Sequence, residues 1–249
     1  MRVRATVAYH GESFHGFAVN EGVRTVGGDL TDALSRCLRQ SVELTCAGRT
    51  DTGVHAWGQV VSFDAPDDAD LLRAHTAVNR MLAPAIVVRD IEAAADNFDA
   101  RFDANSRTYH YTVLNRDVPD PFLAGTAWHC PQPLDIDAMN EAATAIVGEH
   151  DFSSFCRRQH TADGTEKSRV RNVCRAKWHK ADQGLVRFEI EASSFCHQMV
   201  RSITGTLVDI GAARRPPEAM AAILAAKDRA EVPNLAPPHG LCLWSVSYP

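Results

Sequence analysis

The opening residues of the chain alternate between apolar and polar side chains. This period-two pattern over residues 3–10 (VRATVAYH) predicts a β-strand with one buried face. Leucines then recur every four positions within residues 25–40, which predicts an amphipathic helix with Thr25 as its N-cap. The order strand–helix–strand–strand–helix–strand, typical of a ferredoxin-like fold, is completed by strands over residues 42–48, 57–64 and 85–94 and a helix over residues 70–81.

The second half of the chain has a similar mixture of patterns. Residues 107–115 (RTYHYTVLN) alternate like a strand, with Tyr109 and Tyr111 on one face. Residues 182–184 (DQG) separate two strand-like runs and predict a hairpin. The other expected elements are helices over residues 135–147, 195–211 (ending at Gly211) and 216–227, and strands over residues 172–180, 185–192 and 241–248.

These elements predict an α+β protein. We expect a mixed, mainly antiparallel sheet built from two ferredoxin-like halves, residues 1–104 and residues 105–249, with a cleft between them. The two halves share an order of elements and no visible sequence repeat, so the division depends on that order alone.

The composition narrows the class of protein. The 249 residues are 45% hydrophobic and 23% charged, which excludes a mainly disordered, collagen-like or coiled-coil chain. No run of about 18 apolar residues is present, so we expect no contact with a membrane, and the opening residues lack the apolar core of a secretion signal. The sequence therefore predicts a cytoplasmic protein.

The cysteines and the known cofactor motifs are also informative. Seven scattered cysteines without CxxC spacing favour reduced, mostly buried thiols over a zinc ribbon or a thioredoxin-like motif. HExxH, Walker and GxGxxG motifs are absent from the sequence, and the histidines have no metal-ligand spacing. We therefore expect neither a metal nor another cofactor.

Charge is distributed unevenly along the chain. The net charge of −5 argues weakly against a nucleic-acid partner. Residues 157–187, however, contain nine Lys or Arg and only three Asp or Glu. Such a run is by itself more often a solvated surface than a binding site. Its first part, residues 157–172, is polar and without a pattern, which predicts a loop that orders on binding a partner.

The strongest candidate for chemistry is the glycine-bounded loop GRTDTGVHA, which begins at Gly48. Arg49 and Asp51 lie two residues apart within it. A carboxylate beside a guanidinium stays ionised, because the opposite charge favours the charged form, and an ionised carboxylate can act as nucleophile or base. A turn with a structural Arg–Asp ion pair is the alternative interpretation.

This loop carries a family resemblance. Residues 47–64 (AGRTDTGVHAWGQVVSFD) resemble the signature loop of the tRNA pseudouridine synthase A family. Five other segments resemble the same family, in the family's order and across nearly the whole chain: residues 9–17, 97–116, 150–155, 193–211 and 236–248. Six segments in order are far more specific than one short motif.

The resemblance implies a function and site residues. Members of the family are isomerases that convert uridine to pseudouridine in the anticodon stem-loop of tRNA, at positions 38, 39 and 40, usually as homodimers and without a cofactor. By resemblance, Asp51 is the nucleophile and Arg49 keeps it charged and oriented. Tyr109 stacks on the flipped base, Arg201 pairs with Asp51 or a phosphate, and Leu243 lines the uracil pocket.

RNA binding would explain the basic stretch. Arg169 and Arg171 are candidates for phosphate contacts, with Arg157, Arg158 and Lys167 beside them. Three alternatives stay open: a pseudouridine synthase for another RNA, a non-catalytic RNA-binding module, and a small-molecule hydrolase that uses Asp51 with His55. Tyr109, Arg201 and Leu243 could also be ordinary core or helix-surface residues.

Overall fold

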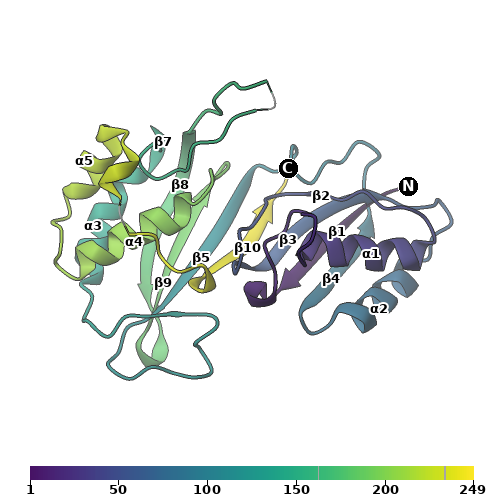
Figure 1. Cartoon of the computed structure of the whole chain (residues 1–249), viewed down its shortest axis with the longest axis horizontal. Coiled ribbons are helices and arrows are strands. Elements are labelled where there is room, and N and C mark those ends of the chain that lie inside the picture. Colours follow the sequence, from purple (N-terminus) through teal and green to yellow (C-terminus); the bar gives the residue numbers. More distant parts are fainter. Residues whose placement is uncertain (162, 233) are drawn as a thin grey trace. The chain divides into compact units, whose positions relative to one another are not determined.

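The computed structural model describes residues 1–161, 163–232 and 234–249, and these residues divide into two compact units (Figure 1). Unit 1 combines Met1–Arg107 with Cys242–Pro249, and unit 2 is Thr108–Leu241. The sequence division assigns residues 242–249 to the second half, whereas the structure counts them in unit 1. The fold class is the predicted one, a mixture of helices with mainly antiparallel strands.

Unit 1 contains the predicted ferredoxin-like order of elements. Strand β1 (Arg2–Tyr9) lies between β3 (His55–Asp64) and β4 (Ile86–Ala93) and is antiparallel to both. The short β2 (Thr45–Cys46) pairs with β3 and is shorter than the strand predicted over residues 42–48. The C-terminal strand β10 (Leu241–Ser247) runs parallel to β3 and pairs with its first residues.

The two helices of unit 1 follow their local sequence signals. Helix α1 (Val26–Leu38) begins where predicted, and the Thr25 side chain accepts a hydrogen bond from the Gly28 N–H at 3.2 Å. Asp70 caps helix α2 (Leu71–Leu82) in the same way. The two helices lie side by side, and α2 packs along β4 (Figure 1). Capping side chains satisfy backbone donors that have no partner within the helix.

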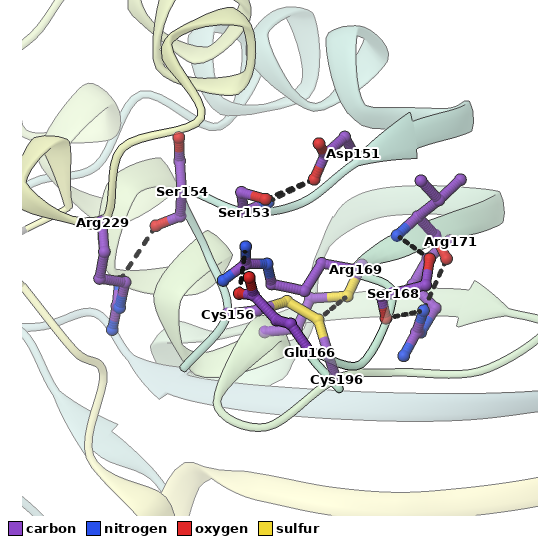
Figure 2. Close-up of a disulfide and its surroundings, with 12 residues drawn as sticks. Asp151, Ser153, Ser154, Cys156, Glu166, Ser168, Arg169, Arg171, Cys196 and Arg229 are labelled. Atoms are coloured by element: carbon purple, nitrogen blue, oxygen red, sulfur yellow. Dashed lines mark hydrogen bonds and ion pairs between the residues drawn. A yellow bond between two sulfur atoms is a disulfide. The ribbon is translucent and has the colours of Figure 1, made fainter. Parts of the chain in front are cut away.

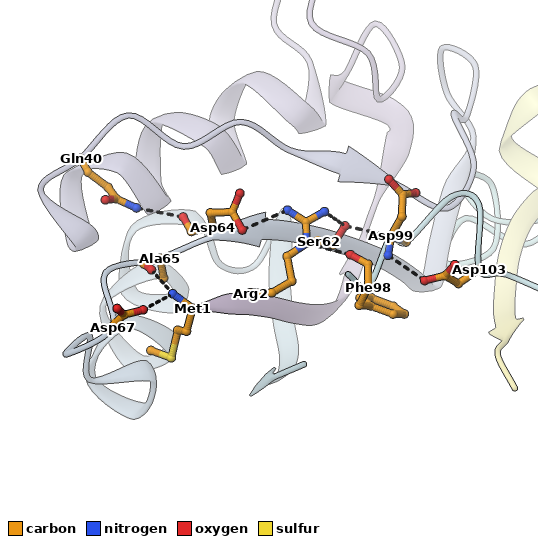
Figure 3. A network of polar contacts seen from close by, with 11 residues as sticks. Met1, Arg2, Gln40, Ser62, Asp64, Ala65, Asp67, Phe98, Asp99 and Asp103 are labelled. Atoms are coloured by element: carbon orange, nitrogen blue, oxygen red, sulfur yellow. Dashed lines mark hydrogen bonds and ion pairs between the residues drawn. The ribbon is translucent and has the colours of Figure 1, made fainter. Parts of the chain in front are cut away.

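Polar contacts hold the start of β1 in place (Figure 3). The Met1 amino group donates to Asp67 Oδ1 at 2.6 Å. Arg2 donates from Nη2 to Ser62 Oγ at 2.9 Å and from Nε to the Phe98 carbonyl at 2.7 Å. These bonds connect β1 with the end of β3 and with the coil that follows β4, so they favour one register of the sheet.

Unit 2 is built around a second group of strands. These are β5 (Ser106–Leu114), β9 (Leu185–Ala192), β8 (Val170–Lys180) and β7 (Gly148–Asp151), in that order across the sheet, and β6 (Trp128–His129) runs parallel to β5. Strands β8 and β9 form the predicted hairpin, and Gln183 and Gly184 have positive φ angles in its turn. That turn, Asp182–Gly184, is a 3-10 helix, as are Thr144–Ile146, Arg229–Glu231 and Pro238–Gly240 of unit 2 and Gly11–Ser13 of unit 1.

The helices of unit 2 are shorter than predicted. They are α3 (Ile136–Ala143), α4 (Met199–Gly211) and α5 (Ala219–Ala226). The prediction that α4 starts at residue 195 is wrong, because Gln198 has a left-handed backbone with φ of 67°. Gly211 is the last residue of α4 and not its cap; a Cβ there would lie 2.5 Å from Met139 Sδ of α3. In the part of the chain that the structure describes, every helix is too short or too polar to cross a membrane.

Candidate functional site

The Asp51 loop, residues 48–54, connects β2 with β3 and is held by the segment that follows β1. The Phe17 N–H donates to the Thr50 carbonyl at 3.0 Å, and the Tyr9 hydroxyl is 2.8 Å from Thr50 Oγ1. Within the loop, the Val54 N–H donates to the Asp51 carbonyl at 3.1 Å. Asp51 itself is half-buried. The backbone on both sides of this carboxylate is therefore fixed by hydrogen bonds.

Two glycines let the segment after β1 approach the loop. Gly16 has φ of +87°, and a Cβ there would lie 2.8 Å from the Thr50 carbonyl oxygen. Gly11 is closer still, since its Cβ would lie 2.1 Å from the Val54 carbonyl oxygen. The Gly11 N–H also donates to Nδ1 of the buried His55 at 2.9 Å. Side chains at these two positions would push the Asp51 loop away.

Arg49 is exposed on the same loop. Its positive charge acts on the neighbouring Cys46 thiol, where it opposes the effect of burial. Burial is the stronger effect and raises the pKa of Cys46 to about 11, so this thiol is protonated at neutral pH. Cys46 is therefore not a candidate nucleophile, and Asp51 stays the candidate of this loop.

Leu243 is a fully buried residue of β10 in the same unit. It pairs with Ala56 of β3, directly after the Asp51 loop, while Cys242 pairs with His55. The structure thus places three of the candidate site residues, Arg49, Asp51 and Leu243, in unit 1. The other candidates, Tyr109, Arg201, Arg169 and Arg171, lie in unit 2.

Tyr109 and Tyr111 have different surroundings on β5. The Tyr109 ring meets the edge of Phe195, with ring centroids 5.1 Å apart and planes at 87°. Tyr111 is fully buried and donates from its hydroxyl to the Pro237 carbonyl at 2.8 Å, and burial raises the pKa of that hydroxyl above its usual range. Tyr111 therefore has a core role, and Tyr109, which is buried but 8% exposed, stays the candidate for stacking. Phe195 was not singled out from the sequence, where it reads as part of a helix.

Arg201 lies in the first turn of α4 and is half-buried. Its Nε donates to the Ala236 carbonyl at 2.7 Å, and its own carbonyl accepts the Ala236 N–H at 3.2 Å. This pair of bonds fixes the start of α4 against the segment before β10. The guanidinium is consequently held in a defined direction by the backbone of residue 236.

The basic stretch is partly ordered. Val170 and Arg171 already belong to β8, which corrects the prediction of a loop up to residue 172. Residues 159–161 and 163–167, called the hairpin below, are joined by two contacts: His160 bridges Glu166, and the Lys167 N–H donates to the Gln159 carbonyl at 3.0 Å. That this segment orders further on binding a partner stays a prediction. Arg169 pairs with Glu166 at 2.7 Å (Figure 2). Arg171 donates to the Ser168 carbonyl at 2.9 Å, and burial lowers the pKa of its guanidinium.

Within residues 157–171, the cations exposed to solvent are not Arg169 and Arg171. Arg157, Arg158 and Lys167 are exposed, whereas the Arg169 side chain is only 16% exposed. Arg158 also approaches Glu166, at 3.9 Å. Arg169 and Arg171 therefore order the base of the hairpin, and the three exposed side chains present its positive charge to solvent.

A disulfide lies at the base of the same hairpin. The prediction of reduced cysteines is wrong for Cys156 and Cys196, whose sulfur atoms are bonded and whose Cα atoms are 5.8 Å apart (Figure 2). The neighbouring Arg157 N–H donates to the His197 carbonyl at 3.0 Å. Cys130 is a buried free cysteine, whereas Cys37, Cys46 and Cys242 are half-buried and Cys174 is exposed, so the free thiols in the described part of the chain are less buried than expected. The disulfide joins the start of the hairpin to the segment that leads into α4 and Arg201.

The sequence did not identify two residues that contact the loop or its neighbours, Tyr9 and Gln59. Tyr9 and Gln59 are buried polar residues at strand positions where the pattern calls for apolar side chains. That mismatch is the signal that could have identified them. Among the residues that the structure describes, no group of three or more His, Cys, Asp or Glu side chains is arranged to hold a metal ion.

Known proteins resemble this chain over its whole length. It is 41% identical to the tRNA pseudouridine synthase A of Pseudothermotoga lettingae over 247 residues, which is 99% of each chain. The enzyme of the same name from Frankia casuarinae is 42% identical and is matched over 90% of its length, and that from Bacillus subtilis is 38% identical over 99% of its length. A family model described as tRNA pseudouridine synthase matches residues 142–249.

One similar solved structure is distant in sequence. The crystal structure of the archaeal box H/ACA sRNP Nop10–Cbf5 complex is 13% identical, covers 83% of this chain and 44% of that one, and has a TM-score of 0.35. This likeness is too weak to add to what the full-length relatives show.

Proposed function

We infer that this chain, which belongs to the tRNA pseudouridine synthase A family, isomerises uridine to pseudouridine in the anticodon stem-loop of tRNA, at positions 38, 39 and 40. The observation that carries this proposal is the identity of about 40% with family members over nearly the full length of both chains. The substrate positions come from the resemblance of the Asp51 loop and five other segments to the same family.

In the proposed reaction the bond between uracil N1 and ribose C1′ breaks, the base turns, and a bond forms between C5 and C1′. The proton lost from C5 is balanced by one gained at N1. Asp51 acts as the nucleophile; attack at the ribose, attack at the base and proton abstraction from the sugar would all use its carboxylate. No oxidant, reductant or water is consumed, so we propose a reaction without a cofactor.

The other candidate residues have supporting roles in this proposal. Arg49 stabilises negative charge on Asp51, and Arg201 binds the phosphate of the flipped nucleotide. Tyr109 stacks on the target base, and its neighbour Phe195 orients the ring. Leu243 lines the uracil pocket from β10.

Binding of tRNA would also use the basic hairpin of unit 2. Phosphates attract the exposed Arg157, Arg158 and Lys167, while Arg169 and Arg171 either contact phosphate or order the hairpin base. We further propose that the protein is cytoplasmic, as its substrate is, and that it acts as a homodimer like its family.

The test uses unmodified tRNA transcripts with tritium at uracil C5, in the presence of chelator. We expect the wild-type protein to release tritium from the anticodon stem-loop, and Asp51→Asn and Asp51→Ala to release none while binding tRNA normally. Release at the normal rate by either variant would show that Asp51 is not the nucleophile. Release from a different RNA would favour another substrate, and no release from any RNA by folded protein would favour a binding module.

A further inference from the structure

A chain of buried polar side chains reaches from the strands of unit 1 to the Asp51 loop. Gln59 of β3 is fully buried, and its amide binds both backbone groups of Gly48: Nε2 donates to the Gly48 carbonyl at 2.6 Å, and Oε1 accepts the Gly48 N–H at 3.3 Å. The same Nε2 is 3.4 Å from the Tyr9 hydroxyl. That hydroxyl in turn is bonded to Thr50 Oγ1 at 2.8 Å.

The polar groups on this path would destabilise the folded protein if they were buried without hydrogen-bond partners. Tyr9 is 5% exposed and Thr50 is 6% exposed, so water cannot replace a missing partner on this path. A buried polar group left without its hydrogen bond lowers the free energy of unfolding by roughly 1–3 kcal/mol. Each member of the path therefore restricts its neighbour, and the two ends of the path are Gly48 and Thr50.

The path fixes alternate residues of the loop. Gly48 and Thr50 are pinned by side chains from β3 and β1, and the Phe17 N–H holds the Thr50 carbonyl from a third direction. Asp51 follows Thr50 directly in the chain. Its backbone position is thus set by groups that belong to neither the loop nor the substrate.

We propose that Tyr9, Thr50 and Gln59 are positioning residues for Asp51. They hold the backbone of residues 48–50 so that the Asp51 carboxylate is placed for attack before tRNA arrives. The inference rests on the proposed function, in which Asp51 is the nucleophile. Because these side chains are buried, the proposal assigns them an effect on the rate of the chemical step and none on tRNA affinity.

The expected effect of the substitutions on the reaction rate follows from the sensitivity of catalysis to the position of the reacting group. A displacement of a reacting group by about 1 Å can cost on the order of a hundredfold in rate. Removing one hydrogen bond of the path leaves the others in place, so a smaller shift results. We expect single substitutions to slow the chemical step by about ten- to a hundredfold.

The experiment removes the bond between Tyr9 and Thr50 from each side. Tyr9→Phe deletes only the hydroxyl, and Thr50→Val replaces the threonine hydroxyl with a methyl group of similar shape. Both variants should lower the single-turnover rate of tritium release by at least about tenfold and leave the Kd for tRNA within about twofold of wild type. The double variant should be no slower than the slower single one, because both changes break the same bond.

Two controls separate positioning from a general loss of structure. Thr50→Ser keeps the hydroxyl and should restore most of the rate lost in Thr50→Val. Tyr248→Phe removes another tyrosine hydroxyl bond of unit 1, to the Ala100 carbonyl at 2.7 Å, and should lower the melting temperature without slowing the reaction. If Tyr9→Phe does not fold, the comparison of Thr50→Val with Thr50→Ser still decides the question.

Several results would overturn the inference. These are rates of Tyr9→Phe and Thr50→Val within about twofold of wild type, a Thr50→Ser variant as slow as Thr50→Val, or an equal loss in Tyr248→Phe. An effect on the Kd for tRNA alone would do the same. Failure of the proposed function looks different, because wild type would then release no tritium or Asp51→Ala would release it normally.

Discussion

Replacing Gly16 with alanine tests how tightly the segment after β1 holds the Asp51 loop. The substitution has two effects that can be separated. Gly16 has φ of +87°, so alanine is strained there whatever the space, and its Cβ would also lie 2.8 Å from the Thr50 carbonyl oxygen. Gly22 is a matched control, since it has φ of +78° and no atom within 4 Å of the position of a Cβ.

The magnitudes follow from these two geometries. Left-handed backbone costs a residue with a Cβ roughly 1–2 kcal/mol, and Gly22→Ala should lose that much and no more. Gly16→Ala must also move the Thr50 carbonyl by about 0.6 Å, from 2.8 Å to the 3.4 Å of an ordinary contact. Overpacking of this kind costs about 1–3 kcal/mol more, which brings the total for Gly16→Ala to about 2–5 kcal/mol.

The assay compares urea unfolding with the rate of tritium release for both variants. Gly16→Ala should lose more free energy of unfolding than Gly22→Ala, and it alone should slow the reaction, by about tenfold or more, because the shifted carbonyl adjoins Asp51. Equal destabilisation of the two variants, together with a normal rate for Gly16→Ala, would refute the idea that close packing against Gly16 places the loop.

Three further predictions concern unit 2. Reducing the disulfide, or changing Cys156 and Cys196 to serine, should lower the free energy of unfolding by up to about 4 kcal/mol in urea, since the bond closes a loop with a sequence separation of 40; equal stability with and without reductant would contradict this. Reversing the charges of the exposed Arg157 and Lys167 should weaken tRNA binding and lower its salt slope by about two; an unchanged slope would remove both residues from the interface. Burial lowers the pKa of His110 to about 4, below its ordinary 6.5, so the folded state keeps it neutral while the unfolded state binds a proton. Stability should therefore be complete above pH 6.5 and fall by about 3 kcal/mol as pH drops to about 4, and His110→Gln should remove this part of the pH dependence measured by urea unfolding.

Local signals in the sequence were sufficient for much of the fold. Helix α1 could be predicted because its apolar stripe and its cap at Thr25 lie within a few residues of each other. The start of α4 could not, because Gln198 takes a left-handed backbone that its own sequence does not demand. The pairing of β10 with β3 joins residues almost two hundred positions apart, and no local pattern encodes such a pairing.

The candidate site shows the same limit. Asp51 and Arg49 could be selected because a carboxylate and a guanidinium share one short glycine-bounded loop. Tyr9 could not be connected to that loop, because its hydrogen bond to Thr50 spans 41 positions in the chain. Gln59 lies only 11 positions from Gly48, but no pattern in the sequence predicts that its amide turns back to bind that backbone. The disulfide between Cys156 and Cys196 is likewise a property of spatial proximity, since the spacing of the cysteines alone favours reduced thiols.

Unit 1 is built from two segments that are far apart in the chain, and this affects how it folds during translation. The ribosome makes β1, β3 and β4 first, then the whole of unit 2, and only afterwards β10. Until β10 emerges, the start of β3 beside the Asp51 loop lacks its parallel neighbour and presents unpaired backbone groups to other nascent chains on the same message. A product of premature termination before residue 241 would lack both that strand and Leu243. Unit 1 is therefore completed only after the ribosome has made the whole of unit 2.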